Sequence, residues 1–336
     1  MRLLVTGGAG FIGSHLTEQL LHDGHQVTVL DDLSTGSLDN LAHLDASPAL
    51  RVEVGSVLDE PLVDELVAGV DAIFHLAAAV GVKLVLDRPL SSLRTNLRGT
   101  ENVLDAAAHH ACRLILASTS EVYGKSERLP LREGDDQIVG SPYVARWLYA
   151  NSKATNEFMA MAYWWEHRLP VTIVRFFNTV GPRQSGRYGM VVPRFVRQAL
   201  GGEPLTVYGD GQQSRCFTYV GDAVRALIAL LHAPLERTAG EVFNVGSTQP
   251  TTIEALAREV LRRTGSTSPL RYVPYGEAYG PGFADLRRRA PDTTKLRETI
   301  GYAPHTPLGE ILDRVIAHER AGRPREAALS GLRTED

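Results

Sequence analysis

Cysteine is scarce in this chain, and the few cysteines present form no pattern. Only Cys112 and Cys216 occur among the 336 residues, and they lie far apart. Small secreted scaffolds carry cysteines in many pairs, and zinc sites place them a few residues apart. The sequence therefore predicts neither a disulfide framework nor a metal site, and a reducing cytoplasm fits it best.

Long apolar runs and an excess of one charge are absent as well. No stretch approaches the ~18 apolar residues that span a bilayer, and the N-terminus lacks the basic head and apolar core of a secretory signal. The 35 Lys and Arg against 39 Asp and Glu leave a formal charge of −4. Such a balance attracts neither nucleic acid nor an anionic membrane. We expect a cytoplasmic protein whose partner is a small molecule.

Short β-branched runs alternate with amphipathic segments through the first half of the chain. The runs predict strands at 3–6, 26–30, 51–54, 72–75, 113–118 and 171–175. Apolar residues at spacings of three and four predict helices at 11–22, 61–67, 91–109 and 149–168. Strands that alternate with helices pair in parallel through right-handed crossovers. The sequence therefore predicts an α/β fold with a doubly wound parallel sheet.

Glycine and proline become frequent after Phe176, and the predicted helices become shorter. This change predicts a smaller C-terminal lobe whose loops face a shared cleft. Helices expected at 252–264 and 308–319 return toward the first domain. We divide the chain into a first domain at 1–175, a substrate-binding lobe at 176–320 and a flexible tail at 321–336.

A glycine-rich turn follows the first predicted strand and opens the first predicted helix. Gly7, Gly10 and Gly13 recur at every third position. Glycine lets the backbone turn tightly and approach a pyrophosphate, whose charge then lies at the helix N-terminus. Asp31 closes the second strand, where a carboxylate accepts from the ribose hydroxyls of an adenosine and repels a 2′-phosphate. We predict a Rossmann-type site that prefers NAD over NADP.

Tyr149 and Lys153 stand about one helical turn apart, so their side chains share a face of the predicted helix. A phenol with a reference pKa of about 10 is a poor base at neutral pH, but a nearby ammonium and the positive ring of NAD+ favour the phenolate. Ser118 and Thr119 end a predicted strand, at the edge where open parallel sheets bind ligands. We predict that Tyr149 removes a proton from a substrate hydroxyl that Thr119 or Ser118 holds.

Six segments together resemble the extended short-chain dehydrogenase/reductase superfamily, specifically its nucleotide-sugar epimerase, dehydratase and decarboxylase branch: residues 5–13, 74–78, 95–100, 118–124, 149–153 and 175–178. The resemblance implies a cycle in which hydride passes from sugar C4 to NAD and later returns. The implied catalytic residues are Thr119, Ser120, Glu121, Tyr149 and Lys153. The implied cofactor contacts are Gly7, Gly10, Phe11, Ile12, Gly13, Asp31, Ser34, Ser56, Val57, Leu76, Ala77, Asn96, Ser118, Tyr149 and Lys153.

The same resemblance implies a nucleotide-diphosphate sugar as the substrate. Arg215 and one arginine of 287–289 suit a pyrophosphate, because forked guanidinium donors match its oxygens. The implied substrate contacts are Lys83, Asn178, Val192, Tyr208, Arg215 and Arg289. By the same resemblance we expect a homodimer that pairs through the long helices at 91–109 and 149–168.

Three reactions are open, and we favour epimerisation because segment 80–83 resembles the sugar-side loop of 4-epimerases. Glu121 stands where 4,6-dehydratases and UDP-glucuronate decarboxylases of this branch carry Glu. The segments around Arg146 and at 289–292 resemble decarboxylases, whereas Ser120 replaces the acid of many dehydratases. UDP-glucuronate decarboxylation is therefore the alternative and dehydration a weaker one. An inactive NAD-binding scaffold is remote, because the tyrosine and lysine pair is intact.

Overall fold

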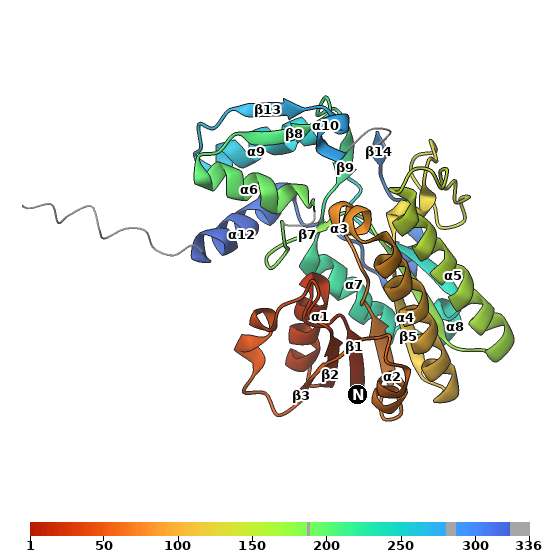
Figure 1. Cartoon of the computed structure of the whole chain (residues 1–336). Coiled ribbons are helices and arrows are strands. Elements are labelled where there is room, and N and C mark those ends of the chain that lie inside the picture. The colour runs from red at the N-terminus through yellow and green to blue at the C-terminus, as the bar shows by residue number, and fades with distance from the viewer. Residues whose placement is uncertain (187–188, 280–286, 323–336) are drawn as a thin grey trace, which may run out of the picture.

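A seven-stranded parallel sheet forms the centre of the protein (Figure 1). The computed structural model describes residues 1–186, 189–279 and 287–322, so most of the tail predicted at 321–336 lies outside the described residues. Every neighbouring pair is parallel in the order β3-β2-β1-β4-β5-β6-β11. The strands are β1 (Arg2–Thr6), β2 (Gln26–Asp31), β3 (Leu50–Val54), β4 (Ala72–His75), β5 (Arg113–Thr119), β6 (Val171–Phe176) and β11 (Glu241–Val245). The predicted doubly wound α/β sheet is confirmed.

Helices cover both faces of the sheet, which is why its central strands are almost continuously apolar. All residues of β4 and β6 are buried. One face packs against α1 (Phe11–His22), α7 (Val220–His232) and α11 (Thr294–Ile300). The other face packs against α2 (Glu60–Val67), α4 (Pro89–His109) and α5 (Trp147–His167). This sandwich leaves the carboxyl ends of the strands as the edge open to ligands.

A smaller lobe lies beyond the carboxyl ends of the central strands (Figure 1). Its core joins α6 (Val191–Gly201), α9 (Ile253–Thr264) and α12 (Leu308–Ala321) to β8 (Leu205–Tyr208), which pairs with β13 (Leu270–Val273). The helices predicted at 252–264 and 308–319 exist, but the expectation that they return to the first domain differs from the structure. Their apolar faces, with Leu256 and Ile311 fully buried, pack within the core of this lobe.

A different segment returns to the first domain. Helix α7 packs on α1, and β11 adds a seventh strand beside β6. Both elements follow the boundary predicted at residue 175, so a first domain at 1–175 lacks one edge strand of its own sheet. The apolar residues of α7 explain the return, because Leu227 and Leu230 complete the core on the α1 face.

Short elements complete the two lobes. The remaining strands are β7 (Thr179–Val180), β9 (Ser214–Cys216), β10 (Thr218–Tyr219), β12 (Pro250–Thr252) and β14 (Arg288–Arg289). The remaining helices are α3 (Val82–Asp87), α8 (Leu235–Thr238), α10 (Tyr275–Tyr279) and the 3-10 helices η1 (Leu38–Asn40), η2 (Ala42–Leu44) and η3 (Ser120–Tyr123). Among the described helices, none is both long and apolar enough to cross a membrane.

Candidate active site

The glycine-rich turn between β1 and α1 has no room for a side chain at Gly7, and the first turn of α1 has none at Gly13. Gly7 adopts a φ of +72°, and a Cβ there would lie 2.8 Å from the nitrogen of Ala77. A Cβ on Gly13 would lie 2.1 Å from the carbonyl oxygen of Gly7. Only glycine therefore lets the turn pack against the end of β4 while its N–H groups gather at the start of α1. This cradle suits a pyrophosphate.

A cavity of about 350 Å³ opens beside this turn, and we call it the cofactor cavity. Most predicted cofactor contacts line it: Gly7, Gly10, Phe11, Ile12, Gly13, Asp31, Ser34, Val57, Leu76, Ala77, Ser118, Tyr149 and Lys153. Ser56 and Asn96 do not. The Ser56 hydroxyl accepts from the nitrogen of Leu58 at 3.2 Å, and the Asn96 amide oxygen accepts from that of Ala79 at 2.8 Å. These two side chains therefore hold loops next to the cavity.

Two backbone donors hold the Asp31 carboxylate at the end of β2. Its oxygens accept from the nitrogens of Ala9 at 2.9 Å and Leu33 at 2.8 Å. Burial raises the pKa of Asp31, and these hydrogen bonds oppose that shift. Each carboxylate oxygen has a further lone pair for a ribose hydroxyl. The arrangement fits the predicted adenosine contact.

Tyr149, Lys153 and Thr119 meet in the same cavity, where α5 passes the end of β5. Lys153 is buried, and its Nζ donates to the carbonyl oxygen of Ala117 at 2.9 Å. Burial lowers the pKa of Lys153 to about 8. Burial and the charge of Glu121 raise the pKa of Tyr149, whereas the Thr119 hydroxyl lowers it. A cationic ring bound beside the phenol would shift its pKa downward.

A buried carboxylate on α5, which our sequence analysis missed, anchors this end of the site. Glu157 accepts from the Ser118 hydroxyl at 2.5 Å and from the Gln137 amide at 2.7 Å, and it pairs with Arg175 at 2.9 and 2.7 Å. The Ser118 hydroxyl thus donates its proton to Glu157, whereas the Thr119 oxygen accepts from the nitrogen of Glu121 at 3.2 Å and keeps its own proton to donate. Glu157 follows the lysine by one more helical turn, and this repeated spacing was the available sequence signal.

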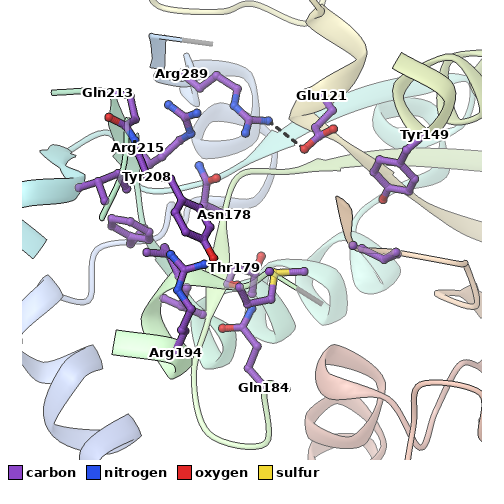
Figure 2. A pocket seen from close by; sticks show the side chains of 18 of the residues that line it. Glu121, Tyr149, Asn178, Thr179, Gln184, Arg194, Tyr208, Gln213, Arg215 and Arg289 are labelled. Carbon is purple, nitrogen blue, oxygen red and sulfur yellow. Dashed lines mark hydrogen bonds and ion pairs between the residues drawn. The ribbon is translucent and has the colours of Figure 1, made fainter. Parts of the chain in front are cut away.

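A second cavity of about 220 Å³ lies between the lobes, and we call it the substrate cavity (Figure 2). Glu121, Tyr149, Asn178 and Arg289 line both cavities, so the phenol lies where the two meet. Asn178 has a φ of +38°, which asparagine tolerates better than most residues, and its amide donates to the carbonyl oxygen of Cys216 at 3.3 Å. The junction can therefore bring a substrate hydroxyl and a cofactor together.

Arg289, Glu121 and Ser120 form a polar cluster at this junction. The Arg289 Nη1 atom lies 3.6 Å from Glu121 Oε1, the contact drawn in Figure 2, and 3.4 Å from the Ser120 hydroxyl. The Arg289 side chain is only 8% exposed. Its neighbours Arg287 and Arg288 are exposed, so of the three predicted candidates Arg289 is the one on the cavity wall.

The rest of the substrate cavity is cationic and aromatic. Arg215 of β9 lies in register with Arg289 of β14, and both line the cavity. The Arg194 guanidinium lies 4.1 Å from the centre of the Tyr208 ring. The Arg215 guanidinium suits a diphosphate, and a flat aromatic surface suits a base. Arg194 was not predicted from the sequence, because only the packing of α6 on β8 brings it here.

One predicted substrate contact, Val192, does not line the cavity that the structure describes. Val192 is fully buried in the core of the smaller lobe, and its neighbour Val191 lines the cavity. Successive residues of a helix point about 100° apart, so Val191 faces the cavity while Val192, one residue later, faces the core. Lys83 belongs to α3, but the structure does not describe its side chain.

Residues 3–246 match the NAD dependent epimerase/dehydratase family. The chain belongs to this family. It is 43% identical over 316 residues to UDP-N-acetyl-alpha-D-glucosaminuronate decarboxylase of Bacillus cytotoxicus. The match covers 94% of this chain and 96% of that protein. The membership confirms the predicted resemblance to the NAD-dependent nucleotide-sugar branch.

Solved structures from this branch share the fold but differ in reaction. A dTDP-glucose 4,6-dehydratase of Streptomyces venezuelae, solved with NAD and TYD, is 33% identical with a TM-score of 0.86 and covers 96% of this chain and 98% of its own. A UDP-glucose 4-epimerase of Thermotoga maritima, solved with UDP-glucose, is 30% identical with a TM-score of 0.85 and covers 96% and 99%. The fold alone therefore does not select the reaction.

As a member of this family the chain is an NAD-dependent enzyme, and its own residues fit the cofactor. Glycine at positions 7 and 13 keeps side chains out of the turn, so a ligand can approach its backbone. Asp31 offers acceptors for ribose hydroxyls, and the buried Lys153 lines the same cavity. NAD as the cofactor, predicted from the sequence, is confirmed.

Proposed function

We propose that the chain decarboxylates a UDP-hexuronate, either UDP-glucuronate or its 2-acetamido analogue. The observation that carries the proposal is the buried guanidinium of Arg289, which lies beside Ser120 and Glu121 where the two cavities meet. The 43% identity to the Bacillus decarboxylase, over nearly the whole of both chains, supports it. The sequence alone favoured epimerisation and left decarboxylation as the alternative, which is the reaction proposed here.

The first step forms a ketone at sugar C4. NAD, when bound, supplies the acceptor for the C4 hydride and later returns that hydride. Thr119 holds the 4-hydroxyl while the Tyr149 phenolate takes its proton. The Lys153 ammonium lies on the same helix face and favours the phenolate by its charge. The burial of Lys153 strengthens this interaction, because water screens buried charges weakly.

The second step removes the C6 carboxylate. A ketone at C4 makes this group a β-keto acid, and the loss of CO2 leaves an enolate that the C4 oxygen stabilises. Arg289 would orient the carboxylate through charge-assisted hydrogen bonds, and Ser120 would donate another. The nearby Glu121 carboxylate weakens the attraction between Arg289 and the substrate carboxylate. The charged substrate is therefore bound and oriented without being strongly stabilised. C5 then takes up a proton from solvent, and once C4 is reduced again Tyr149 returns its proton to the 4-oxygen.

Epimerisation is the second candidate. The T. maritima epimerase shares the fold over nearly its whole length, and the C4 oxidation needs the same tyrosine and lysine. Epimerisation differs afterwards, because the keto sugar must present its other face to the cofactor. A buried arginine beside Ser120 and Glu121 gives no advantage for that step, whereas it matches a carboxylate.

The proposal is tested by incubating the protein with UDP-glucuronate, UDP-N-acetylglucosaminuronate and UDP-glucose, followed by mass spectrometry. At least one uronate should lose the mass of one CO2, and UDP-glucose should keep its mass. Arg289→Gln should lower kcat/KM for the uronate by about a hundredfold, as expected for a buried charge-assisted contact. Arg288→Gln is the matched control, because this neighbour is exposed. A uronate product of unchanged mass with inverted C4 would contradict decarboxylation.

We further infer a homodimer that pairs through α4 and α5, as the resemblance implies. Phe158 and Trp165 lie about two turns apart on α5 and expose 65% and 58% of their surfaces. Residues seven apart share one helix face. An apolar face of this kind is typical of a helix that packs against a partner.

A further inference from the structure

A loop from the smaller lobe crosses to the first helix of the NAD-binding domain. The loop comprises residues 181–186 after β7, and its Arg183 lines the cofactor cavity. Arg183 has a φ of +66°, a left-handed conformation that side chains disfavour. A disfavoured backbone persists only where surrounding contacts maintain it. The contacts of Arg183 therefore indicate what the loop is built to do.

The Arg183 guanidinium contacts α1 at two points. Its Nη2 donates to Glu18 Oε2 at 2.6 Å, and its Nη1 lies 3.5 Å from the Ser14 hydroxyl. His43 Nε2 lies 3.3 Å from the same Nη2 and 3.2 Å from Glu18. Only 16% of the Arg183 side chain is exposed. The ion pair therefore links two lobes at the cavity rim, with Arg183 largely buried and Glu18 41% exposed.

A neutral hydrogen bond reinforces the ionic one. The His15 Nε2–H donates to the carbonyl oxygen of Pro182 at 3.0 Å. Burial lowers the pKa of His15 to about 4, so the ring is neutral at pH 7. Burial alone would raise the pKa of Glu18, but the bond and charge of Arg183, together with His43, keep it below its usual value. The acceptor for Arg183 is therefore an anion.

We propose that Arg183 and Glu18 clasp this loop onto α1 and so retain the cofactor between the two hydride transfers. Helix α1 begins at the glycine cradle and Arg183 lines the same cavity, so the clasp lies on the wall of the cavity that the cradle serves. The inference rests on the proposed function in one respect: a cycle that returns its hydride fails whenever the reduced cofactor leaves midway. Epimerisation carries the same requirement. Arg183 is thus a positioning residue that acts through the loop.

The test measures how fast bound NADH leaves, with no sugar nucleotide present. Protein loaded with NADH is mixed with an excess of a second dehydrogenase and its substrate, which consume released NADH, and the loss of bound fluorescence is followed. Arg183→Gln and Glu18→Ala should each speed release about tenfold, the loss of one charge-assisted bond. The double variant should be no faster than the faster single variant, because both changes remove one interaction.

Lys295→Gln is the matched control. It removes an ion pair of the same 2.6 Å length, between Lys295 of α11 and Glu241 of β11, and neither residue lines the cofactor cavity or the substrate cavity. Release at the wild-type rate in both Arg183→Gln and Glu18→Ala would overturn the clasp. So would fast release in Arg183→Gln alone, because the guanidinium would then hold the cofactor directly. If Arg183→Gln fails to fold, Glu18→Ala decides, since 41% of the Glu18 side chain is exposed. The measurement needs no turnover, so its outcome is independent of which sugar reaction occurs.

Discussion

Tyr149 is the residue on which the proposed chemistry depends. It lines both cavities, and the Thr119 hydroxyl beside it lowers a pKa that burial raises. Tyr149→Phe removes only the proton acceptor, so turnover should fall by about a thousandfold or more while NAD stays bound. Steady-state kinetics and the NAD content of the purified variant check both parts. Near-normal turnover in this variant would mean that another group is the base.

Glu121 affects how the activity should depend on pH, because its charge shifts the pKa of Tyr149. Its negative charge raises the pKa of Tyr149, after the larger effect of burial. Glu121→Gln should therefore lower that pKa and increase the phenolate fraction at a given pH. The acidic limb of the kcat/KM profile should move to lower pH, whatever happens to the maximal rate. A limb that stays in place, or moves to higher pH, would show that Tyr149 does not control it.

The residues that the sequence predicted best are those whose geometry lies within one short segment. The glycine turn fixes Gly7 and Gly13 locally, and one helix fixes Tyr149 against Lys153. Arg194 could not be predicted in this way, because its place depends on how α6 packs on β8. The roles of these residues stay predictions, to be decided by the variants described here.

At the scale of elements, α5 carries both the chemistry and a buried ion pair that holds it in place. Glu157 and Arg175 are each about 95% buried, and they tie α5 to β6. Glu157→Ala leaves an uncompensated guanidinium, so the cofactor-free protein should lose about 3–5 kcal/mol of unfolding free energy. Urea unfolding measures this loss. A change no larger than that of Arg262→Ala, which breaks an exposed pair on α9, would contradict the stabilising role.

Element boundaries followed from periodicity wherever helices and strands alternate strictly. The helix predicted at 11–22 is α1 without change, and that predicted at 91–109 begins two residues early at Pro89. Periodicity did not predict β11. The chain passes through the smaller lobe between β6 and β11, so no local sequence pattern indicates that these two strands pair. The partner of β11 is β6, which precedes it by more than sixty residues.

At the scale of the whole molecule, the exposed face of α5 predicts the oligomeric state. Phe158→Glu places a charge on this face and should convert a dimer into a monomer, as measured by light scattering. Leu235→Glu, on exposed α8, is the control and should leave the dimer intact. A monomeric wild-type protein would remove the dimer from this account.

The two-lobe architecture explains why the fold was predictable and the reaction was not. The sheet follows from strand and helix alternation, whereas the reaction depends on which side chain the smaller lobe brings to the junction. Arg289 arrives there on β14, in register with Arg215, from a segment far along the chain. Sequence reasoning placed Arg289 at a diphosphate, whereas its contacts with Ser120 and Glu121 lie beside the phenol.

The most direct test of the account is the reaction of the UDP-hexuronate in deuterated water, analysed by mass spectrometry and NMR. Oxidation at C4, loss of CO2 and return of the same hydride predict a product that lacks the carboxylate, carries one solvent deuterium at C5 and keeps its original hydrogen at C4. A product with its carboxylate intact, or with solvent deuterium at C4, would contradict the account.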